Sequence, residues 1–261
     1  MARRSLPGKR VIVTGASSGI GRALARVLHQ AGASLLITAR RRERLEQLAA
    51  ELASSGESPW CVCGDLTDPQ TRARIFQVVE ERWGALDALI NNAGVGGAGP
   101  FAQADAARLR QILDTNFIAP VELIRHALPW LRQGHAPIIV NIGSVLGHCA
   151  IPNKSEYCAS KFALHGFSDS LRAELAGEGI DVLLVSPSTT DSEFFERELD
   201  ATTVPVRPFG KMSPESVARQ ICRGMERGKA DLILSPGGKV LVAMNRWFPS
   251  VTRFFLARWK S

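Results

Sequence analysis

Short apolar runs alternate with longer amphipathic stretches along almost the whole chain. The runs are rich in β-branched residues, as in strands that are buried on both faces. They occupy residues 10–14, 33–39, 60–66, 86–90, 138–142, 180–186 and 230–234. Helical patterns separate these runs. The alternation predicts an α/β fold, a parallel, doubly wound sheet with right-handed crossovers.

Helix signals lie between several of these runs. Asp68 followed by Pro69 matches an N-cap residue with proline in the first turn. We expect residues 105–132 to form one helix, kinked at Pro120. Asn116 lies just before the kink, where a freed backbone carbonyl could hold a water; a helix-capping role is the alternative.

The last part of the chain departs from the alternation. We expect one domain over residues 1–238, with a substrate lid at about 189–212, and a C-terminal tail of the same domain over 239–261. Arginines lie among the aromatic residues of the tail, which is interrupted at Pro249. Such a segment could lie on a membrane surface or gate an apolar substrate. Packing on its own body or on a sister subunit is favoured, because most aromatic stripes are buried.

Composition narrows the class of protein. The chain has 261 residues, 45% of them hydrophobic, which is enough for a sizeable core. Its net charge of +7 favours anionic ligands such as a phosphorylated cofactor. The five cysteines have no metal-site spacing and predict free thiols in a cytoplasmic compartment. We expect no signal peptide in residues 1–10, and no apolar run reaches the roughly 18 residues of a membrane span.

Three glycines follow the first strand and precede a helical stretch. Gly15 permits a tight turn, Gly19 lets the backbone approach a pyrophosphate, and Gly21 lets helix and strand pack closely. The N-terminus of the helix then offers its N–H groups to the phosphates. A plain βα turn is the alternative. The glycine turn lies at the first βα junction of an alternating chain, and this position favours a dinucleotide site.

The second strand ends in a basic run. An acidic residue normally stands here when a ribose 2′-hydroxyl is bound, but this chain has Arg40, Arg41 and Arg42. A guanidinium binds a 2′-phosphate bidentately. The alternative is a solvated basic start to the next helix. We favour phosphate binding by Arg40, because it lies at the carboxyl end of the strand.

Other strand ends supply further candidate contacts. Asp65 could accept a hydrogen bond from an adenine amino group. After the fourth strand, asparagine amides could brace the sheet edge, and Gly94 permits approach to a ribose. Thr189 and Thr190, after the sixth strand, could bond a carboxamide or a phosphate. In each case a plain turn or loop is the alternative.

A hydroxyl, a phenol and an ammonium group occur in one short run. Tyr157 and Lys161 are four residues apart and therefore share one face of a helix. Ser144 lies thirteen residues before Tyr157, at the end of the apolar run 138–142. A strand end that faces the following helix would bring Ser144 against Tyr157. This set suits proton transfer to a carbonyl or from an alcohol.

Taken together, the motifs resemble the short-chain dehydrogenase/reductase family over nearly the whole chain. The matching residues, in the order of the family, are Thr14, Gly15, Gly19, Gly21, Asp65, Asn91, Asn92, Ala93, Gly94, Asn116, Ser144, Tyr157 and Lys161. The resemblance implies a Rossmann fold with a catalytic tetrad of Asn116, Ser144, Tyr157 and Lys161. It also associates the basic run with NADP(H). The chain departs from the family at Pro187-Ser188, where Pro-Gly is usual.

The predicted reaction is hydride transfer between NADP(H) and a carbonyl or secondary alcohol, with Tyr157 as general acid–base. A free phenol has a pKa near 10, so work near neutrality requires about 4 kcal/mol of preferential stabilisation of the phenolate, which Lys161 and the oxidised nicotinamide can supply. The candidate cofactor-binding residues are Gly15, Ser17, Ser18, Gly19, Ile20, Gly21, Arg40, Asp65, Leu66, Asn92, Ala93, Gly94, Tyr157, Lys161, Pro187, Thr189 and Thr190. The candidate substrate-binding residues are Ser144, Leu146, His148, Tyr157 and Phe194, with Val95, Ile151 and Phe195 as further wall residues.

These mostly apolar wall residues favour a hydrophobic substrate. The resemblance suggests a homodimer or homotetramer built on the helices that contain Asn116 and Tyr157. A non-catalytic NADP(H)-binding regulator on the same fold is the main alternative, since a fold alone does not determine function. We expect no metal site and no nucleic-acid binding, because no recognised DNA-reading motif is present. The expected location is cytoplasmic, with possible peripheral membrane contact through the tail.

Overall fold

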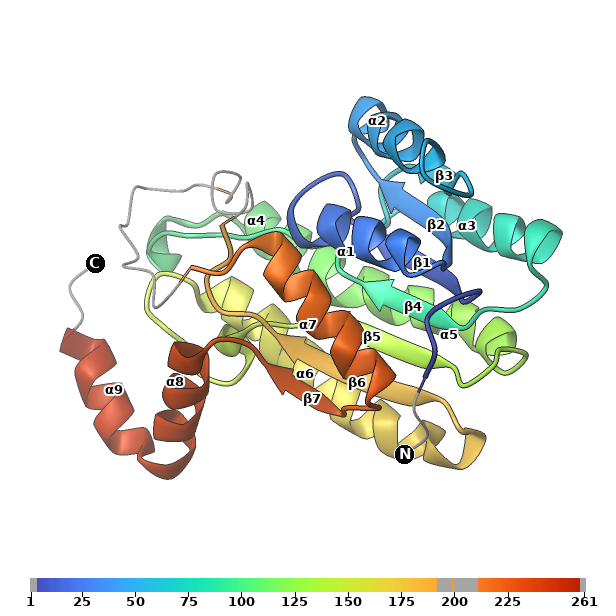
Figure 1. The fold of residues 1–261 in the computed structure, drawn as a ribbon. Coiled ribbons are helices and arrows are strands. Elements are labelled where there is room, and N and C mark those ends of the chain that lie inside the picture. The colour runs from blue at the N-terminus through green and yellow to red at the C-terminus, as the bar shows by residue number, and fades with distance from the viewer. Residues whose placement is uncertain (1–3, 192–198, 200–210, 259–261) are drawn as a thin grey trace.

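The chain folds around one parallel sheet with helices on both faces, as the alternation predicts (Figure 1). The computed structural model describes residues 4–191, 199 and 211–258. The seven strands lie side by side in the order β3-β2-β1-β4-β5-β6-β7. Their bounds are β1 Arg10–Thr14, β2 Ser34–Ala39, β3 Trp60–Cys63, β4 Ala88–Asn91, β5 Ile138–Ile142, β6 Asp181–Ser186 and β7 Asp231–Ile233. The strand order reverses between β1 and β4, and ligands of open α/β sheets bind at such a point.

The core lies on both faces of the sheet, because side chains alternate along each strand. In β1, Val11 and Val13 join one cluster of buried residues, and Ile12 between them joins the other. The first cluster includes residues of α1 Gly19–Gln30, α2 Arg42–Ala53 and α7 Pro214–Glu226. The second includes residues of α3 Pro69–Arg82, α5 Ala119–Leu131 and α6 Ser155–Leu175. The central strands are buried on both sides, which explains their unbroken apolar runs.

The helix expected over residues 105–132 is broken, and the break is not a kink at Pro120. The segment consists of α4 Ala106–Leu113, a π-helical turn Asp114–Ile118 and α5. Pro120 is the second residue of α5, which continues the π turn with helical backbone angles, so its missing N–H deprives the Asn116 carbonyl of its usual helical donor. The π turn contains Asn116, and such turns frequently lie at functional sites.

Two other boundaries differ from the expectation. The third strand ends at Cys63, before Asp65, because Gly64 and the residues that follow turn toward the N-cap of α3. Asp68 forms this cap, and its carboxylate accepts hydrogen bonds from the N–H groups of Gln70 and Thr71. At the other end of the chain, the tail expected from residue 239 begins three residues earlier, with α8 at Pro236. Ser235 accepts a hydrogen bond from the N–H of Gly238 and caps α8.

The C-terminal tail forms two helices, α8 Pro236–Trp247 and α9 Pro249–Arg258, and the interruption lies at Pro249 as expected. The favoured interpretation was packing on the body of the same chain or on a sister subunit. Packing on the same chain is wrong for the described residues, and packing on a sister subunit stays a prediction. Trp247 is 74% exposed and Phe255 is 61% exposed. The described helices include none long and apolar enough to span a bilayer.

Candidate active site

The glycine turn lies at the point where the strand order reverses, pressed against the loop after β4. Gly15 has φ +65°, and a Cβ on it would lie 2.9 Å from the Cα of Ala93. A Cβ on Gly21 would lie 2.3 Å from the carbonyl oxygen of Gly15. Asn92 braces the turn, since its Nδ2 donates to the Thr14 oxygen at 2.9 Å. The amides after β4 therefore brace the site, as one of the two interpretations of this loop predicted.

The first turn of α1 has no side-chain cap. Ser18 is the N-cap residue but makes no side-chain capping hydrogen bond. Its hydroxyl instead accepts from Nη2 of Arg41 at 2.6 Å, and the hydroxyl of Ser17 accepts from Nε of Arg41 at 3.1 Å. A helix N-terminus with an arginine beside it is an anion site that fits the phosphates of a dinucleotide.

Arg40 and Arg41 of the basic run make different contacts, and Arg41 rather than Arg40 reaches the glycine turn. The Arg40 side chain is 58% exposed, and its guanidinium lies 3.7 Å from the Asp65 carboxylate. Asp65 also accepts from the backbone N–H and the hydroxyl of Thr67. Arg41, not Arg40, contacts the serines of the glycine turn. Its place in the same basic run was the only sequence signal for it.

Tyr157 and Lys161 lie on adjacent turns of α6 and face the same side. The Lys161 ammonium lies 5.7 Å from the centre of the Tyr157 ring. Tyr157 is the only tyrosine of the chain. Lys161 is buried, and its Nζ donates to the Ile142 oxygen at the end of β5 at 3.0 Å. Among the described residues the Ile142 oxygen accepts one of the three N–H groups of the Lys161 ammonium. The other N–H groups can donate to the ribose hydroxyls of a cofactor.

Burial lowers the pKa of the Lys161 ammonium to about 8. The amine is therefore largely charged at pH 7, and this cation lies within one helical turn of the phenol. A nearby cation favours the ionised form of an acid. The pair is suited to holding and releasing a proton at the Tyr157 oxygen.

Ser144 lies at the carboxyl end of β5 and begins the 3-10 turn Val145–Gly147. Its hydroxyl accepts a hydrogen bond from the Leu146 N–H at 3.1 Å. The turn packs directly on α6, since a Cβ on Gly147 would lie 2.7 Å from the Lys161 carbonyl oxygen. The fold thus brings residues 144–148, which we call the serine loop, onto the helix turn that carries Lys161. The expected contact of Ser144 with Tyr157 itself stays a prediction.

Asn116 ties the π turn to two other parts of the site. Its Oδ1 accepts from the Val95 N–H at 2.8 Å, and its Nδ2 donates to the Val95 oxygen and to the Ser160 hydroxyl. The Ser160 hydroxyl in turn donates to the Tyr157 carbonyl oxygen at 2.8 Å. A Cβ on Gly94 would lie 3.1 Å from the Asn116 Oδ1 and 3.8 Å from the Lys161 Nζ. The structure therefore brings the four predicted tetrad residues into one region.

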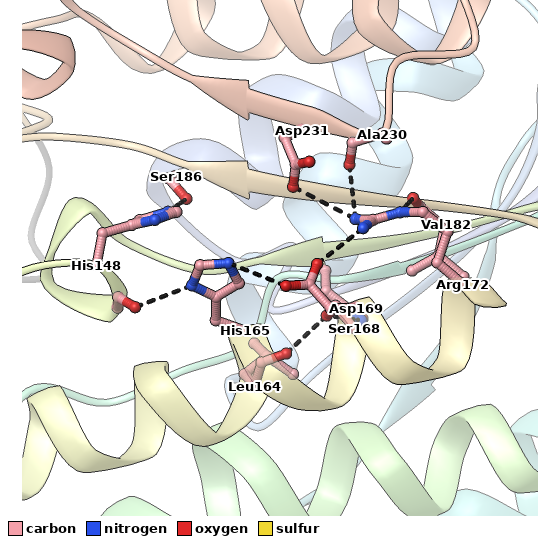
Figure 2. Close-up of polar contacts among 12 residues, drawn as sticks. His148, Leu164, His165, Ser168, Asp169, Arg172, Val182, Ser186, Ala230 and Asp231 are labelled. Atoms are coloured by element: carbon pink, nitrogen blue, oxygen red, sulfur yellow. Dashed lines mark hydrogen bonds and ion pairs between the residues drawn. The ribbon is translucent and has the colours of Figure 1, made fainter. Parts of the chain in front are cut away.

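Two histidines support the serine loop, and neither was expected to do so (Figure 2). The Nδ1 of His165 on α6 lies 3.0 Å from the Gly147 oxygen. His148 was a candidate substrate contact or a surface histidine. Its Nε2 instead lies 2.8 Å from the Ser186 hydroxyl, and its ring lies 4.2 Å from that of His165. Burial and the neighbouring His165 lower the pKa of His148, which favours the neutral ring.

The predicted contacts after β6 are only partly described. The Pro187 oxygen accepts from the Val145 N–H, and Thr189 and Thr190 pair with the Met212 segment. Thr190 is buried, and Thr189 is half-buried. Phe194, Phe195 and most of the expected lid lie outside the described residues. Leu146 and Ile151 are half-buried beside the serine loop, and Val95 is buried.

The sequence matches the family model of the short chain dehydrogenases over residues 9–202. The chain belongs to the short-chain dehydrogenase/reductase family. It is 36% identical to dehydrogenase/reductase SDR family member 7B of Bos taurus, over 86% of this chain and 73% of that protein. It is 30% identical to the uncharacterized oxidoreductase YxnA of Bacillus subtilis, over 95% and 71% of the two chains. The family assignment makes the protein a nicotinamide-dependent oxidoreductase.

Solved structures of the family agree with the fold. A short-chain dehydrogenase of Burkholderia cenocepacia in complex with NADP is 28% identical, with a TM-score of 0.81 over 90% of this chain and all of that one. A family member from Burkholderia phymatum in complex with NAD is 22% identical, with a TM-score of 0.86 over 95% and 96% of the two chains, and shows the fold alone. One relative holds NADP and the other holds NAD.

Proposed function

We propose that the protein is an NADP(H)-dependent carbonyl reductase or alcohol dehydrogenase that acts on an apolar ketone or secondary alcohol. The observation that carries this proposal is the buried Lys161 ammonium, 5.7 Å from the ring of the only tyrosine. Burying a cation costs free energy, and buried ionisable groups with perturbed pKa values cluster at functional sites. A buried ammonium beside a phenol therefore supports a role in proton transfer. The serine loop and the glycine turn lie at the same edge of the sheet.

The cofactor supplies or accepts the hydride. The residues that fit it are the glycine turn, the uncapped N-terminus of α1, Arg41 over the two serines, Gly94 and Lys161. We assign the 2′-phosphate chiefly to Arg41, with Arg40 beside it. This assignment is supported by the short contacts of Arg41 to the Ser17 and Ser18 hydroxyls. The Asp65 carboxylate near Arg40 weakens the case for Arg40 as the main phosphate ligand.

The proton moves at the Tyr157 oxygen. In reduction Tyr157 donates it to the substrate oxygen, and in oxidation Tyr157 removes it. Lys161 stabilises the phenolate through its charge, and the Ser144 hydroxyl orients the substrate oxygen. Asn116 holds the π turn and the loop after β4 in register with α6. The hydrogen bonds of the Asn116 side chain to Val95 and Ser160 support this bracing role. A water held by the backbone carbonyl of Asn116 is the proposed route for proton exchange.

Apolar residues near the serine loop support a hydrophobic substrate. Leu146 and Ile151 are half-buried there. An assembly through the helices of the site is also proposed. Large apolar side chains on these helices are exposed, with Ile118 at 46% and Phe162 at 43%. We therefore propose a homodimer or homotetramer, which light scattering of the purified protein tests. A cytoplasmic location is a separate part of the proposal.

The deciding experiment compares wild type with Tyr157→Phe. Wild type should oxidise NADPH in the presence of apolar ketones, and the variant should lose turnover while it binds NADPH as tightly as before. Fluorescence titration measures the binding, and absorbance of the reduced nicotinamide measures the turnover. Retained turnover in the variant would exclude Tyr157 as the acid–base. Binding of NADPH without turnover of any ketone or alcohol in wild type would support the non-catalytic regulator.

A further inference from the structure

The C-terminal hairpin, which we define as α8 and α9, extends from the body at the carboxyl end of the sheet (Figure 1). Gly238 and Thr252 are the buried residues of its two helices. The hairpin meets the body at the serine loop, where Asn245 Nδ2 donates to the His148 oxygen at 2.9 Å. A Cβ on Gly238 would lie 2.9 Å from the Val145 side chain. The hairpin is thus held against the body by one face of α8, at Gly238 and at Asn245.

The exposed apolar side chains of the hairpin fall into two stripes. Val240, Met244 and Trp247 are spaced by four and three residues along α8 and share one face. Phe254 and Phe255 follow Val251 by three and four residues along α9 and share a face with it. All six are exposed, from 39% for Met244 to 74% for Trp247. Phe248, between the helices, is 62% exposed. Apolar surface of this extent marks an interaction site.

The charge of this region has a single sign. The sequence contains no acidic residue after Asp231. The helices carry Lys239, Arg246, Arg253 and Arg258. The Arg258 guanidinium lies over the Phe254 ring, 3.5 Å from its centre, so a basic and an aromatic group form one unit. Basic residues flanking aromatic and aliphatic side chains match the boundary between anionic headgroups and acyl chains.

We propose that the hairpin docks on an anionic lipid surface, with its two apolar stripes in the headgroup region. Neither helix is long enough to span a bilayer, so the hairpin lies on the surface. A second copy of the chain fits less well. A two-fold symmetric contact through the hairpin would place the same basic residues opposite one another, without acidic partners on the hairpin. The aliphatic Val240, Met244 and Val251 also match acyl chains.

The docking surface adjoins the candidate active site. Helix α8 carries both Trp247 and Asn245. Asn245 donates to the oxygen of His148, which lies three residues after the start of the 3-10 turn. Lipid contact at the hairpin therefore places the site close to the membrane, where apolar ketones and alcohols concentrate. This consequence rests on the proposed function, whereas the docking itself does not.

Co-sedimentation of the full chain with lipid vesicles tests the proposal. The vesicles contain phosphatidylcholine alone or phosphatidylcholine mixed with phosphatidylglycerol, and neither substrate nor cofactor is added. Wild type should partition onto the mixed vesicles about tenfold more strongly than onto the neutral ones, with less binding at high salt. Two double variants, Trp247→Ser with Phe255→Ser and Arg246→Glu with Arg253→Glu, should each lose about tenfold of the binding to mixed vesicles.

The matched control is Phe101→Ser, which removes an aromatic side chain that is 66% exposed outside the hairpin. It should bind vesicles like wild type, and equal melting temperatures should show that all variants fold. The proposal is overturned if wild type binds neither kind of vesicle, or if the control loses as much binding as the hairpin variants. It is also overturned if light scattering shows that the aromatic double variant dissociates an assembly of wild type. Each of these results leaves the oxidoreductase proposal untouched, because turnover is not measured.

Discussion

The Lys161 ammonium and the Tyr157 ring lie 5.7 Å apart on successive turns of α6, and the ammonium is buried beneath the end of β5. The helix sets this distance through the spacing of four residues. The sheet sets the burial, because Ile142 at the end of β5 accepts the hydrogen bond. The arrangement favours proton transfer at the phenol, and it has a cost in stability.

Replacing Lys161 by Met should stabilise the cofactor-free protein at pH 7 while abolishing turnover. Burial lowers the pKa of Lys161 from its usual 10.5 to about 8. This difference corresponds to about 3 kcal/mol at pH 7. Between about pH 8 and 10.5 the unfolded chain binds the proton that the folded chain has released, so wild-type stability should rise with pH in this window. Urea unfolding at pH 7 and pH 10 measures the stability gain of the variant and the pH dependence of wild type.

The matched control for this prediction is Lys229→Met, which removes an exposed lysine. Its free energy of unfolding should stay within about 0.5 kcal/mol of wild type at both pH values. The gain from Lys161→Met should shrink at pH 10. A destabilisation of equal size at pH 7 and pH 10 would contradict the assigned cost of the buried charge.

Cofactor preference should depend on Arg41 more than on Arg40. Arg41→Ala should weaken NADPH binding by about tenfold, or about 1.4 kcal/mol, because its guanidinium already lies on the serines of the glycine turn. NADH, which lacks the 2′-phosphate, should bind equally well to wild type and variant. The control is Arg42→Ala, because the Arg42 side chain is 70% exposed and pairs with Glu46. Weaker NADPH binding in Arg40→Ala but not in Arg41→Ala would reverse the assignment.

The choice between two adjacent arginines marks the limit of what the sequence predicts. The seven strands were recognisable because strands buried on both faces are nearly continuous apolar runs. The relation of Tyr157 to Lys161 follows from helical spacing alone. The sequence argument chose Arg40 from its position at the strand end. Which guanidinium reaches the serines depends on how the chain turns into α2, and spacing does not determine that.

Context also decided the elements that were misplaced. Proline is tolerated in the first turn of a helix, and Pro236 begins α8. Pro120, four residues after Asn116, signals a break in the helix but not the π turn that forms there. Contacts from Val95 and Ser160, distant in the sequence, accompany its conformation. The roles of His148 and His165 likewise depend on tertiary contacts that no periodicity predicts.

Removing one partner of the buried ion pair beside Tyr157 should be strongly destabilising. The Arg108 Nη2 lies 2.7 Å from the Glu156 carboxylate, and both side chains are 3% exposed. Burial raises the pKa of the Glu156 carboxyl. The hydrogen bonds from Arg108, from Ser155 and from the backbone, together with the Arg108 charge, outweigh burial and hold this pKa below its usual value. Arg108→Met should cost about 3–5 kcal/mol at pH 7, because it leaves a buried carboxylate without its main partner. Urea unfolding measures the loss.

Arg110→Met is the control for this pair, since Arg110 lies on the same helix and is exposed. It should change the free energy of unfolding by less than about 0.5 kcal/mol. The contribution of Glu156 is present above the usual pKa of a glutamate and should be lost as the pH falls through its lowered pKa. Similar losses in both variants would mean that the ion pair adds nothing beyond the helix itself.

His165 should act as a positioning residue for the serine loop. A carbonyl oxygen only accepts, so the His165 Nδ1 carries the hydrogen that it donates to the Gly147 oxygen. The other ring nitrogen, Nε2, lies 3.4 Å from the Asp169 carboxylate and donates to it only when the ring is protonated (Figure 2). His165→Ala removes this support three residues after Ser144. We expect kcat to fall by about tenfold, because small misplacements of a reacting group are costly, with NADPH binding unchanged.

Two further variants separate positioning from a general loss of stability. His165→Asn retains an N–H donor for the Gly147 oxygen and should recover much of kcat. His126→Ala removes an exposed histidine of α5 and should leave kcat at the wild-type value. Steady-state kinetics with NADPH and an apolar ketone, together with fluorescence titration of NADPH, measure these effects. If the alanine variant instead weakens NADPH binding and spares kcat, the contact supports the cofactor side of the site rather than the serine loop.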